Sequence, residues 1–301
     1  MAAPPDPSTR IFGVIARAAP RVVLIRRGPT KHVLLLTWDT SKHEFHSGQW
    51  FKGRIYEERC DLSPKGDKLI YLAASHKGEL QSWTAVSRPP FLTALALWPN
   101  MGTWGGGGLF ESDRVIAINS CYPAVTPRSG VRIPKDVRVV PIARWAGRGE
   151  DDPIRALRMK RDGWELADAG ETKVYRTTKP YSWEFERPER WRKRRGNLIL
   201  ERRLLGIHEI NGPWYAREHY LLDGQENILL ALGRSDWADW SQSGELLFAR
   251  EGRVHRVVIG AGDAPGKPDE LIDLGALRFE EVPPPPDALS WSSKVVGKRI
   301  R

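Results

Sequence analysis

Apolar residues occur in short runs along this chain, and turn-forming residues separate one run from the next. Near the start, three such runs are Ile11–Ala16, Arg21–Arg26 and Val33–Trp38, with Ala-Pro and Gly-Pro dipeptides between them. Each run is rich in β-branched or aromatic residues and is too short for a helix of ordinary length. The pattern predicts an antiparallel meander of three strands here, and roughly eighteen to twenty-two strands in the whole chain.

The middle of the chain is less regular, and residues 120–200 show no clean repeat. Between residues 154 and 166, the Asp162-Gly163 dipeptide is a hairpin signal. We therefore expect two strands there, Ala156–Arg161 and Trp164–Asp168, joined by that turn. Further strand-like runs follow at Lys173–Thr177, Tyr181–Glu186, Asn197–Leu205 and Trp214–Leu222.

Two turns far apart in the chain share one pattern. Asp61–Gly66 (DLSPKG) precedes the apolar run Lys68–Ala73, and Asp239–Gly244 (DWSQSG) precedes Leu246–Ala249. Both have Asp-x-Ser and a glycine five residues after the aspartate. We expect the Asp and Ser side chains to bond the turn's own backbone and the glycine to supply a positive φ. Leu109–Asn119 is a weaker third copy.

These turns resemble the blade turns of TolB-like and WD-repeat β-propellers, in which D-x-S-P-D-G precedes a strand. Asp61–Tyr71 matches with Lys65 in place of the usual acidic residue, and Asp239–Phe248 has Gln242 in place of proline. The resemblance implies an all-β propeller of about five or six blades, with an irregular insertion or degenerate blades in the middle. Two hairpins in another all-β fold would give the same two motifs.

On this reading residues 10–290 are a single propeller domain, between a disordered tail of residues 1–9 and a basic tail of residues 291–301. A strand within residues 11–16 or 21–26 would complete a blade with strands near residues 271–282. Pro283–Pro286 is a stiff polyproline stretch. The basic tail is expected to be frayed or bound to a partner.

Composition supports strands and indicates a cytoplasmic protein. The chain has 13 Trp, and its 23 Pro and 28 Gly are frequent enough to break long helices. No apolar run is long enough to span a membrane, and residues 1–9 lack the pattern of a secretory signal. The two cysteines, Cys60 and Cys121, do not make a disulfide framework. The Arg-rich composition is typical of a bacterial genome of high GC content.

The formal net charge of +10 is concentrated in one run. Residues 187–203 hold eight Lys or Arg against two Glu, and Trp183 and Trp191 accompany them. Cations interleaved with aromatic rings are one way to bind single-stranded nucleic acid. A protein-docking patch or a solvated loop has the same composition. The candidate patch consists of Arg187, Arg190, Trp191, Arg192, Lys193, Arg194 and Arg195.

A second candidate site is the glycine-rich loop, which consists of Trp104, Gly105, Gly106, Gly107 and Gly108. It is not a nucleotide-binding phosphate loop, because no Gly-Lys-Ser/Thr follows it. Consecutive glycines can bind an anion through their amides or line the mouth of a propeller. They can also let the backbone crowd past Trp98 and Trp104.

Motifs for catalysis, cofactors or metals are missing. His43 and His46 lack a second pair of zinc ligands, there is no Gly-x-Ser-x-Gly, and Asp151-Asp152 and Glu280-Glu281 are typical of solvated loops.

The sequence therefore favours a non-catalytic propeller scaffold in a larger bacterial assembly, without cofactor or membrane contact. Its docking residues would include Trp50, Trp83, Trp191 and Trp291. The first alternative is a nucleic-acid-associated subunit that uses the basic patch. The second is a hydrolase or lyase whose central cleft takes carboxylates from different blades.

Overall fold

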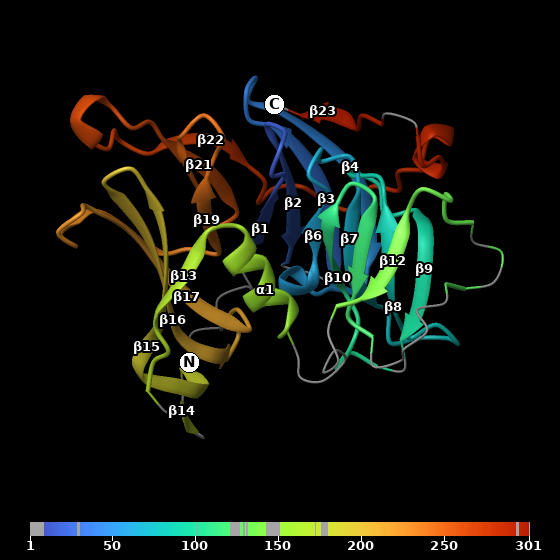
Figure 1. The fold of residues 1–301 in the computed structure, drawn as a ribbon, viewed down its shortest axis with the longest axis horizontal. Coiled ribbons are helices and arrows are strands. Elements are labelled where there is room, and N and C mark those ends of the chain that lie inside the picture. Colours follow the sequence, from blue (N-terminus) through green and yellow to red (C-terminus); the bar gives the residue numbers. More distant parts are fainter. Residues whose placement is uncertain are drawn as a thin grey trace. The chain divides into compact units, whose positions relative to one another are not determined.

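The computed structural model describes residues 9–28, 31–100, 102–120, 127–128, 130, 132–142, 151–171, 173–175, 180–292 and 295–300. Within these residues the structure is all-β, with five sheets, one α-helix and three short 3-10 helices (Figure 1). None of the described helices is long and apolar enough to cross a membrane. Residues 1–8, most of the expected N-terminal tail, and Cys121 lie outside the described residues.

The contacts within the chain group it into two compact units. The first unit contains residues 13–27, 31–158 and 278–301, and the second contains residues 9–12, 28 and 159–277. Each unit is described below by itself, and β1 (Arg10–Ile15) is described with the first unit although its first three residues are grouped with the second.

The first unit is built around three sheets. One has the order β1-β2-β3-β4-β23, another has β5-β7-β8-β9 with β6 beside β7, and the third has β10-β11-β12. The strands are β1 (Arg10–Ile15), β2 (Arg21–Arg27), β3 (His32–Asp39), β4 (Glu44–Lys52), β5 (Arg54–Ile55), β6 (Asp61–Leu62), β7 (Leu69–Ala74), β8 (Ser82–Ser87), β9 (Ala94–Asn100), β10 (Gly108–Ser112), β11 (Val115–Ile118), β12 (Arg138–Pro141) and β23 (Lys298–Ile300). The meander predicted for the first runs is confirmed, because β1, β2 and β3 are consecutive neighbours.

A buried cluster joins two of these sheets. It consists of Ile70, Val86, Ala96, Trp98, Phe110, Ile116 and Ile118. These residues come from β7, β8, β9, β10 and β11, so the sheets of β5–β9 and β10–β12 share one apolar core. Burial of this much apolar surface is the main favourable term for the unit.

The second unit has a six-stranded and a four-stranded sheet. The larger has the order β13-β15-β16-β17-β18 with β14 also paired to β15, and the smaller has β19-β20-β21-β22. The strands are β13 (Trp164–Asp168), β14 (Lys173–Tyr175), β15 (Tyr181–Arg195), β16 (Leu198–Glu209), β17 (Tyr215–Leu222), β18 (Ile228–Arg234), β19 (Trp237–Trp240), β20 (Leu246–Arg250), β21 (Arg253–Val257) and β22 (Asp269–Asp273). Neighbouring strands in these two sheets run antiparallel to each other.

The helix α1 (Ile154–Arg161) corrects the prediction of a strand at Ala156–Arg161, whereas the strand predicted at Trp164–Asp168 is confirmed as β13. Ala, Leu, Met, Lys and Arg in this stretch are all good helix formers. The Asp152 carboxylate accepts the amide of Ala156 at 3.3 Å, and the turn after the helix contains Gly163 at φ 86°. The Asp-Gly pair thus ends a helix instead of closing a hairpin.

The two repeated turns have the same hydrogen bonds. The Ser63 N–H donates to the Lys68 carbonyl at 2.8 Å, and its hydroxyl accepts the Lys68 amide at 3.0 Å. In the other turn, the N–H of Ser241 donates to the carbonyl of Glu245 at 2.9 Å and its hydroxyl accepts that residue's amide at 3.0 Å. The predicted role of serine is therefore confirmed in both units.

The glycines of these turns have the predicted conformation, but only one of the two aspartates bonds to the backbone of its own turn. Gly66 and Gly244 have φ of 71° and 96°, as predicted. Asp239 accepts the neighbouring Trp240 amide at 2.8 Å. Asp61, in contrast, accepts the amide of Phe110 on β10 at 2.7 Å. That buried carboxylate therefore links the sheet of β5–β9 to the sheet of β10–β12.

The chain ends differ from the expectation. The residues near 271–282 supply β22, which pairs with β21, and the described structure places β1 and β22 in different sheets. The strand from the end of the chain that joins the first sheet is β23, whose Arg299 lies opposite His46 on β4. Part of the predicted frayed tail is thus an ordered edge strand.

The three 3-10 helices lie in segments that connect strands. They are η1 (Glu57–Arg59), η2 (Ala261–Asp263) and η3 (Pro286–Leu289). Of these, η1 and η3 belong to the first unit, and both contribute to the features described next.

Candidate functional site

The glycine-rich loop connects β9 to β10 in the first unit, and it presents one large aromatic ring to solvent. Trp104 is 68% exposed, the largest exposed fraction among the large hydrophobic side chains of the described residues. Gly106, Gly107 and Gly108 are buried just behind it. An exposed tryptophan on a buried base is unusual, because an indole ring normally packs inside.

The glycines are required by packing. A Cβ at Gly107 would lie 2.5 Å from the carbonyl oxygen of Arg59, and one at Gly108 would lie 2.4 Å from that of Ala117. Gly106 and Gly107 also have φ of 90° and 79°, a region in which other residues are strained. The crowding involves the backbone of Arg59 and Ala117 and nearby side chains such as Asn100, and not the tryptophan rings that the sequence suggested.

The amides of this loop donate inside the protein. The Gly106 N–H donates to the Asn119 carbonyl at 2.9 Å, and the Gly107 N–H donates to the Thr84 hydroxyl at 2.7 Å. Asn119 returns two bonds, from its backbone N–H to the Gly107 carbonyl at 2.9 Å and from Nδ2 to the Gly106 carbonyl at 3.2 Å. These two amides are therefore used for the fold, and the loop is not arranged as an anion-binding nest.

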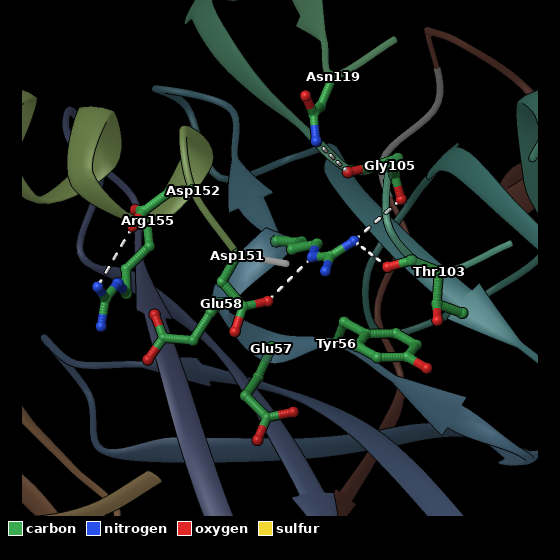
Figure 2. A network of polar contacts seen from close by, with 12 residues as sticks. Tyr56, Glu57, Glu58, Thr103, Gly105, Asn119, Asp151, Asp152 and Arg155 are labelled. Atoms are coloured by element: carbon green, nitrogen blue, oxygen red, sulfur yellow. Dashed lines mark hydrogen bonds and ion pairs between the residues drawn. The ribbon is translucent and has the colours of Figure 1, made fainter. Parts of the chain in front are cut away.

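Arg59, at the end of η1, fixes the loop on both sides of the tryptophan. Its Nη1 donates to the carbonyl of Thr103 at 2.5 Å and to that of Gly105 at 2.9 Å (Figure 2). The guanidinium also lies over the ring of Tyr56, 5.4 Å from its centroid. Because one buried donor holds the carbonyls just before and just after Trp104, the backbone that carries the indole is fixed. We call this arrangement the Arg59 clamp.

Asp151 holds the arginine itself. Its Oδ1 lies 2.9 Å from Arg59 Nε, and the two side chains are 10% and 1% exposed. A buried guanidinium is stable only when a partner and hydrogen bonds replace its hydration, as they do here. The sequence pattern indicated a solvated Asp151-Asp152 pair. Asp152 is indeed 54% exposed and pairs with Arg155 at 3.4 Å, but Asp151 is buried in the clamp (Figure 2).

A second buried ion pair lies beside the clamp. Arg158 of α1 binds Glu58 at 2.8 Å, with exposed fractions of 8% and 2%. The same guanidinium donates to the carbonyls of Cys60 and Glu57. Glu58 and Arg59 are adjacent in η1, so both pairs fix the same short helix.

Cys60 lies next to Arg59 and is buried. That burial raises the pKa of its thiol above the ordinary value. Its sulfur lies 3.2 Å from the Tyr56 carbonyl. Across the described residues, no group of three or more His, Cys, Asp or Glu side chains is arranged to hold a metal ion.

The basic run lies in the second unit, on β15 and β16, and carboxylates accompany many of its cations. Arg192 is 13% exposed and binds Glu201 at 2.7 Å and Glu226 at 2.6 Å. Hydrogen bonding to Glu226 raises the pKa of Arg192, while burial acts in the opposite direction. Arg203 binds the other oxygen of Glu201 at 2.6 Å, so this fully buried carboxylate is shared between two strands.

The remaining cations of the candidate patch differ in their partners. Arg187 and Arg190 both bind Asp168, and Lys193 binds Asp239 at 2.6 Å. Arg194 and Arg195 are exposed at the end of β15, where Arg195 also donates to the Ser241 carbonyl at 3.2 Å.

Trp191, the aromatic residue of the candidate patch, is buried. It is 4% exposed, and its indole Nε1 donates to Glu189 at 2.9 Å. This corrects the expectation that Trp191 is a surface docking residue. Trp50, Trp83 and Trp291 are half-buried. The exposed tryptophans among the described residues are Trp104 and Trp183.

Comparison of the chain with models of protein families, with curated proteins and with solved structures finds no match. The function is therefore inferred from geometry. What sequence reasoning missed was Arg59, because nothing in the stretch Glu57–Asp61 distinguishes a clamp from an ordinary charged turn.

Proposed function

We propose that the protein is a non-catalytic platform that binds another protein, and that Trp104 is a central contact of the interface. The observation that carries this proposal is the Arg59 clamp: a buried ion pair fixes the backbone on both sides of a 68% exposed indole. Tryptophan is among the residues most enriched at the energetic centre of protein interfaces.

Rigidity makes such a ring a better anchor. A partner that buries Trp104 gains the transfer of a large apolar surface from water. It does not have to order the loop, because Arg59, Asn119 and Thr84 already hold Thr103 to Gly107. Less ordering cost on binding leaves more of the contact energy as affinity. A loop kept for stability alone would gain more by burying the indole.

We infer further that the successive sheets are blades of a propeller. Consecutive strands form most of each sheet, and the same serine turn occurs in both units. Propellers are common rigid platforms with variable loops, so this fold suits the proposed role. An experimental structure with the sheets arranged around one axis is the expected result, and an open arrangement of the two units would contradict it.

The test is a single substitution with a matched control. The tagged full chain, a Trp104→Ala variant and a Tyr175→Ala variant are used to co-purify partners from the native host, with quantitative mass spectrometry. Tyr175 is 61% exposed and lies in the second unit, so it matches Trp104 in exposure. A partner retained by the wild type and by Tyr175→Ala is then purified, and its Kd is measured for each variant.

We expect Trp104→Ala to weaken that complex by about 30-fold or more, equivalent to about 2 kcal/mol. Its urea unfolding midpoint should equal that of the wild type, because the exposed ring makes little contribution to folding. A partner that binds Trp104→Ala with unchanged Kd would show that the loop is not the interface.

The second candidate function is association with single-stranded nucleic acid. The exposed Arg194 and Arg195 at the end of β15 are the observation in its favour. Gel-shift titration of single-stranded DNA at 50 and 200 mM salt tests it, since phosphate contacts weaken steeply with salt. Arg194→Glu with Arg195→Glu should abolish this binding, whereas Trp104→Ala should leave it unchanged.

A further inference from the structure

The polyproline stretch of the first unit is a fixed, partly exposed polyproline II helix. A proline ring sets φ near −65°, and a following proline drives the preceding residue to an extended ψ. Pro283, Pro284 and Pro285 each have both constraints, since each is a proline followed by a proline. Pro285 has φ −68° and ψ 157°, the values of polyproline II. The stretch then turns into η3.

The start of this stretch is attached to β4 and its neighbours. The Gln49 Nε2 donates to the Val282 carbonyl at 3.3 Å. The oxygen of the same side-chain amide is also bonded: Gln49 Oε1 accepts hydrogen bonds from the backbone N–H groups of Leu92 and Thr93 at 2.7 and 3.1 Å. Gln49 therefore connects the polyproline stretch to the segment between β8 and β9.

The end of the stretch is fixed as well. Ala288 of η3 is fully buried, and Arg88, 3% exposed, donates to the carbonyls of Ser290 and Trp291. Arg88 is itself paired with Asp67 at 3.6 Å. Attachments on both sides hold the prolines against the unit without covering them completely. Figure 1 shows this segment in red, with η3 before β23.

The exposure pattern follows the threefold repeat of the helix. Pro283 and Pro286 are exposed, whereas Pro284 and Pro285 are half-buried. Polyproline II has three residues per turn. Pro283, Pro284 and Pro285 carry its constraints up to the start of η3 at Pro286, so residues 283 and 286 share one edge, about 9 Å apart. That edge is the P-x-x-P spacing which aromatic-lined grooves recognise. The protein thus presents the recognition edge outward and packs the other residues inward.

The charge of this sequence segment is opposite to that of the whole chain. From residue 279 to residue 293 there are three acidic residues and no Lys or Arg, although the net charge of the chain is +10. Glu281 and Asp287 are exposed on either side of the prolines, whereas Glu280, 63% exposed, pairs with Lys298 of β23 at 3.7 Å. Leu289, 60% exposed, adds an apolar side chain beyond the prolines.

We propose that residues 280–289 are a docking site for a partner domain that binds polyproline II helices in an aromatic-lined groove with a Lys- or Arg-rich rim. Both ends of the segment are already fixed, so the partner loses little conformational entropy on binding. None of the residues of this docking site belongs to the glycine-rich loop or to the Arg59 clamp.

The test uses the full chain and two double substitutions in the same stretch. Pro283→Ala with Pro286→Ala removes the exposed edge, and Pro284→Ala with Pro285→Ala is the matched control. The probes are immobilised SH3, WW and EVH1 domains, chosen because each binds proline-rich helices in an aromatic groove. Binding of the purified chain is measured by biolayer interferometry, and thermal unfolding confirms that each variant is folded.

We expect at least one of these probe domains to bind the wild type. The exposed-edge variant should then bind at least 10-fold more weakly, and the control should lose less than threefold. If the edge variant fails to fold, a Glu280→Gln, Glu281→Gln, Asp287→Gln variant replaces it, and its affinity for the probe domain that binds the wild type should fall about fivefold. No binding to any probe, or equal losses in the two proline variants, would overturn the proposal.

Discussion

Arg59 in the first unit is 1% exposed and gives its bonds to two backbone carbonyls and one aspartate, whereas Arg192 in the second unit gives its bonds to Glu201 and Glu226. In the first arrangement the guanidinium of Arg59 fixes a loop, and its charge is buried away from solvent. The second pairs an arginine of β15 with Glu201 of the neighbouring strand β16 and with Glu226 of the turn before β18, so two carboxylates neutralise its charge.

The difference shows why net charge is a poor guide to a binding site in this protein. The run at residues 187–203 has a local charge of +6 when it is counted along the sequence, from eight Lys or Arg and two Glu. In the folded unit, Asp168, Asp239 and Glu226 reach the same cations from other strands and turns. A single buried arginine, isolated in sequence, has a clearer structural role.

The largest expected effect is that of Arg59→Met. The substitution leaves Asp151 as a largely buried carboxylate without its guanidinium and frees the carbonyls of Thr103 and Gly105. Removing one partner of a buried pair costs about 3–5 kcal/mol. We expect a decrease of about 3 kcal/mol in the free energy of unfolding, measured with urea at pH 7, and faster proteolysis of the glycine-rich loop.

The matched variant in the other unit is Arg187→Met, which removes a 49% exposed arginine from its pairs with Asp168 and Glu171. Its unfolding midpoint should be nearly that of the wild type, because exposed pairs are screened by solvent. If Arg59→Met and Arg187→Met decrease the free energy of unfolding by the same amount, the buried and the exposed arginine do not differ in their contribution to stability.

Gly107→Ala tests the packing of the loop independently of charge. The new Cβ would lie 2.5 Å from the Arg59 carbonyl oxygen, at a φ of 79° that alanine adopts with strain. We expect a loss of about 2 kcal/mol from the backbone strain and the displacement together. Gly102→Ala is the control, since a Cβ at that position would have no neighbouring atom within 4 Å. Comparable urea midpoints for the two variants would show that the loop can shift.

The features that the sequence predicted are those that depend on neighbouring residues. The serine turns at Ser63 and Ser241 are closed by bonds to residues four and five positions away, so the local pattern contains all the partners. The helix α1 was missed because Asp162-Gly163 is compatible with a hairpin and with a helix end, and the capping Asp152 is what distinguishes them.

The candidate site was only partly predictable, because most of its contacts join residues that are far apart in the sequence. The segment Trp104–Gly108 stands out in the sequence as a loop of unusual composition. The clamp joins Gly105 of this segment to Arg59, 46 residues earlier along the chain, and joins Arg59 to Asp151, 92 residues later. No local pattern encodes such pairs, and only the packing of β5–β11 and α1 brings them together.

The smallest expected effect concerns pH and Asp67, the carboxylate beside the buried Arg88. Burial alone would raise the pKa of Asp67, but the hydrogen bond and charge of Lys68, with Ser63 and Arg88, lower it below the ordinary value. The unfolded chain, with an ordinary pKa near 3.9, therefore takes up the proton first as pH falls. The stabilisation from Asp67 is present above about pH 4 and is lost as pH decreases through the folded pKa.

Asp67→Asn should be less stable than the wild type at pH 7, and the difference should shrink at pH 3. Asp136→Asn, which alters a 60% exposed carboxylate, should parallel the wild type in urea unfolding at both pH values. If the difference in the free energy of unfolding between the wild type and Asp67→Asn stays constant from pH 7 to pH 3, the charge of Asp67 does not stabilise the buried Arg88.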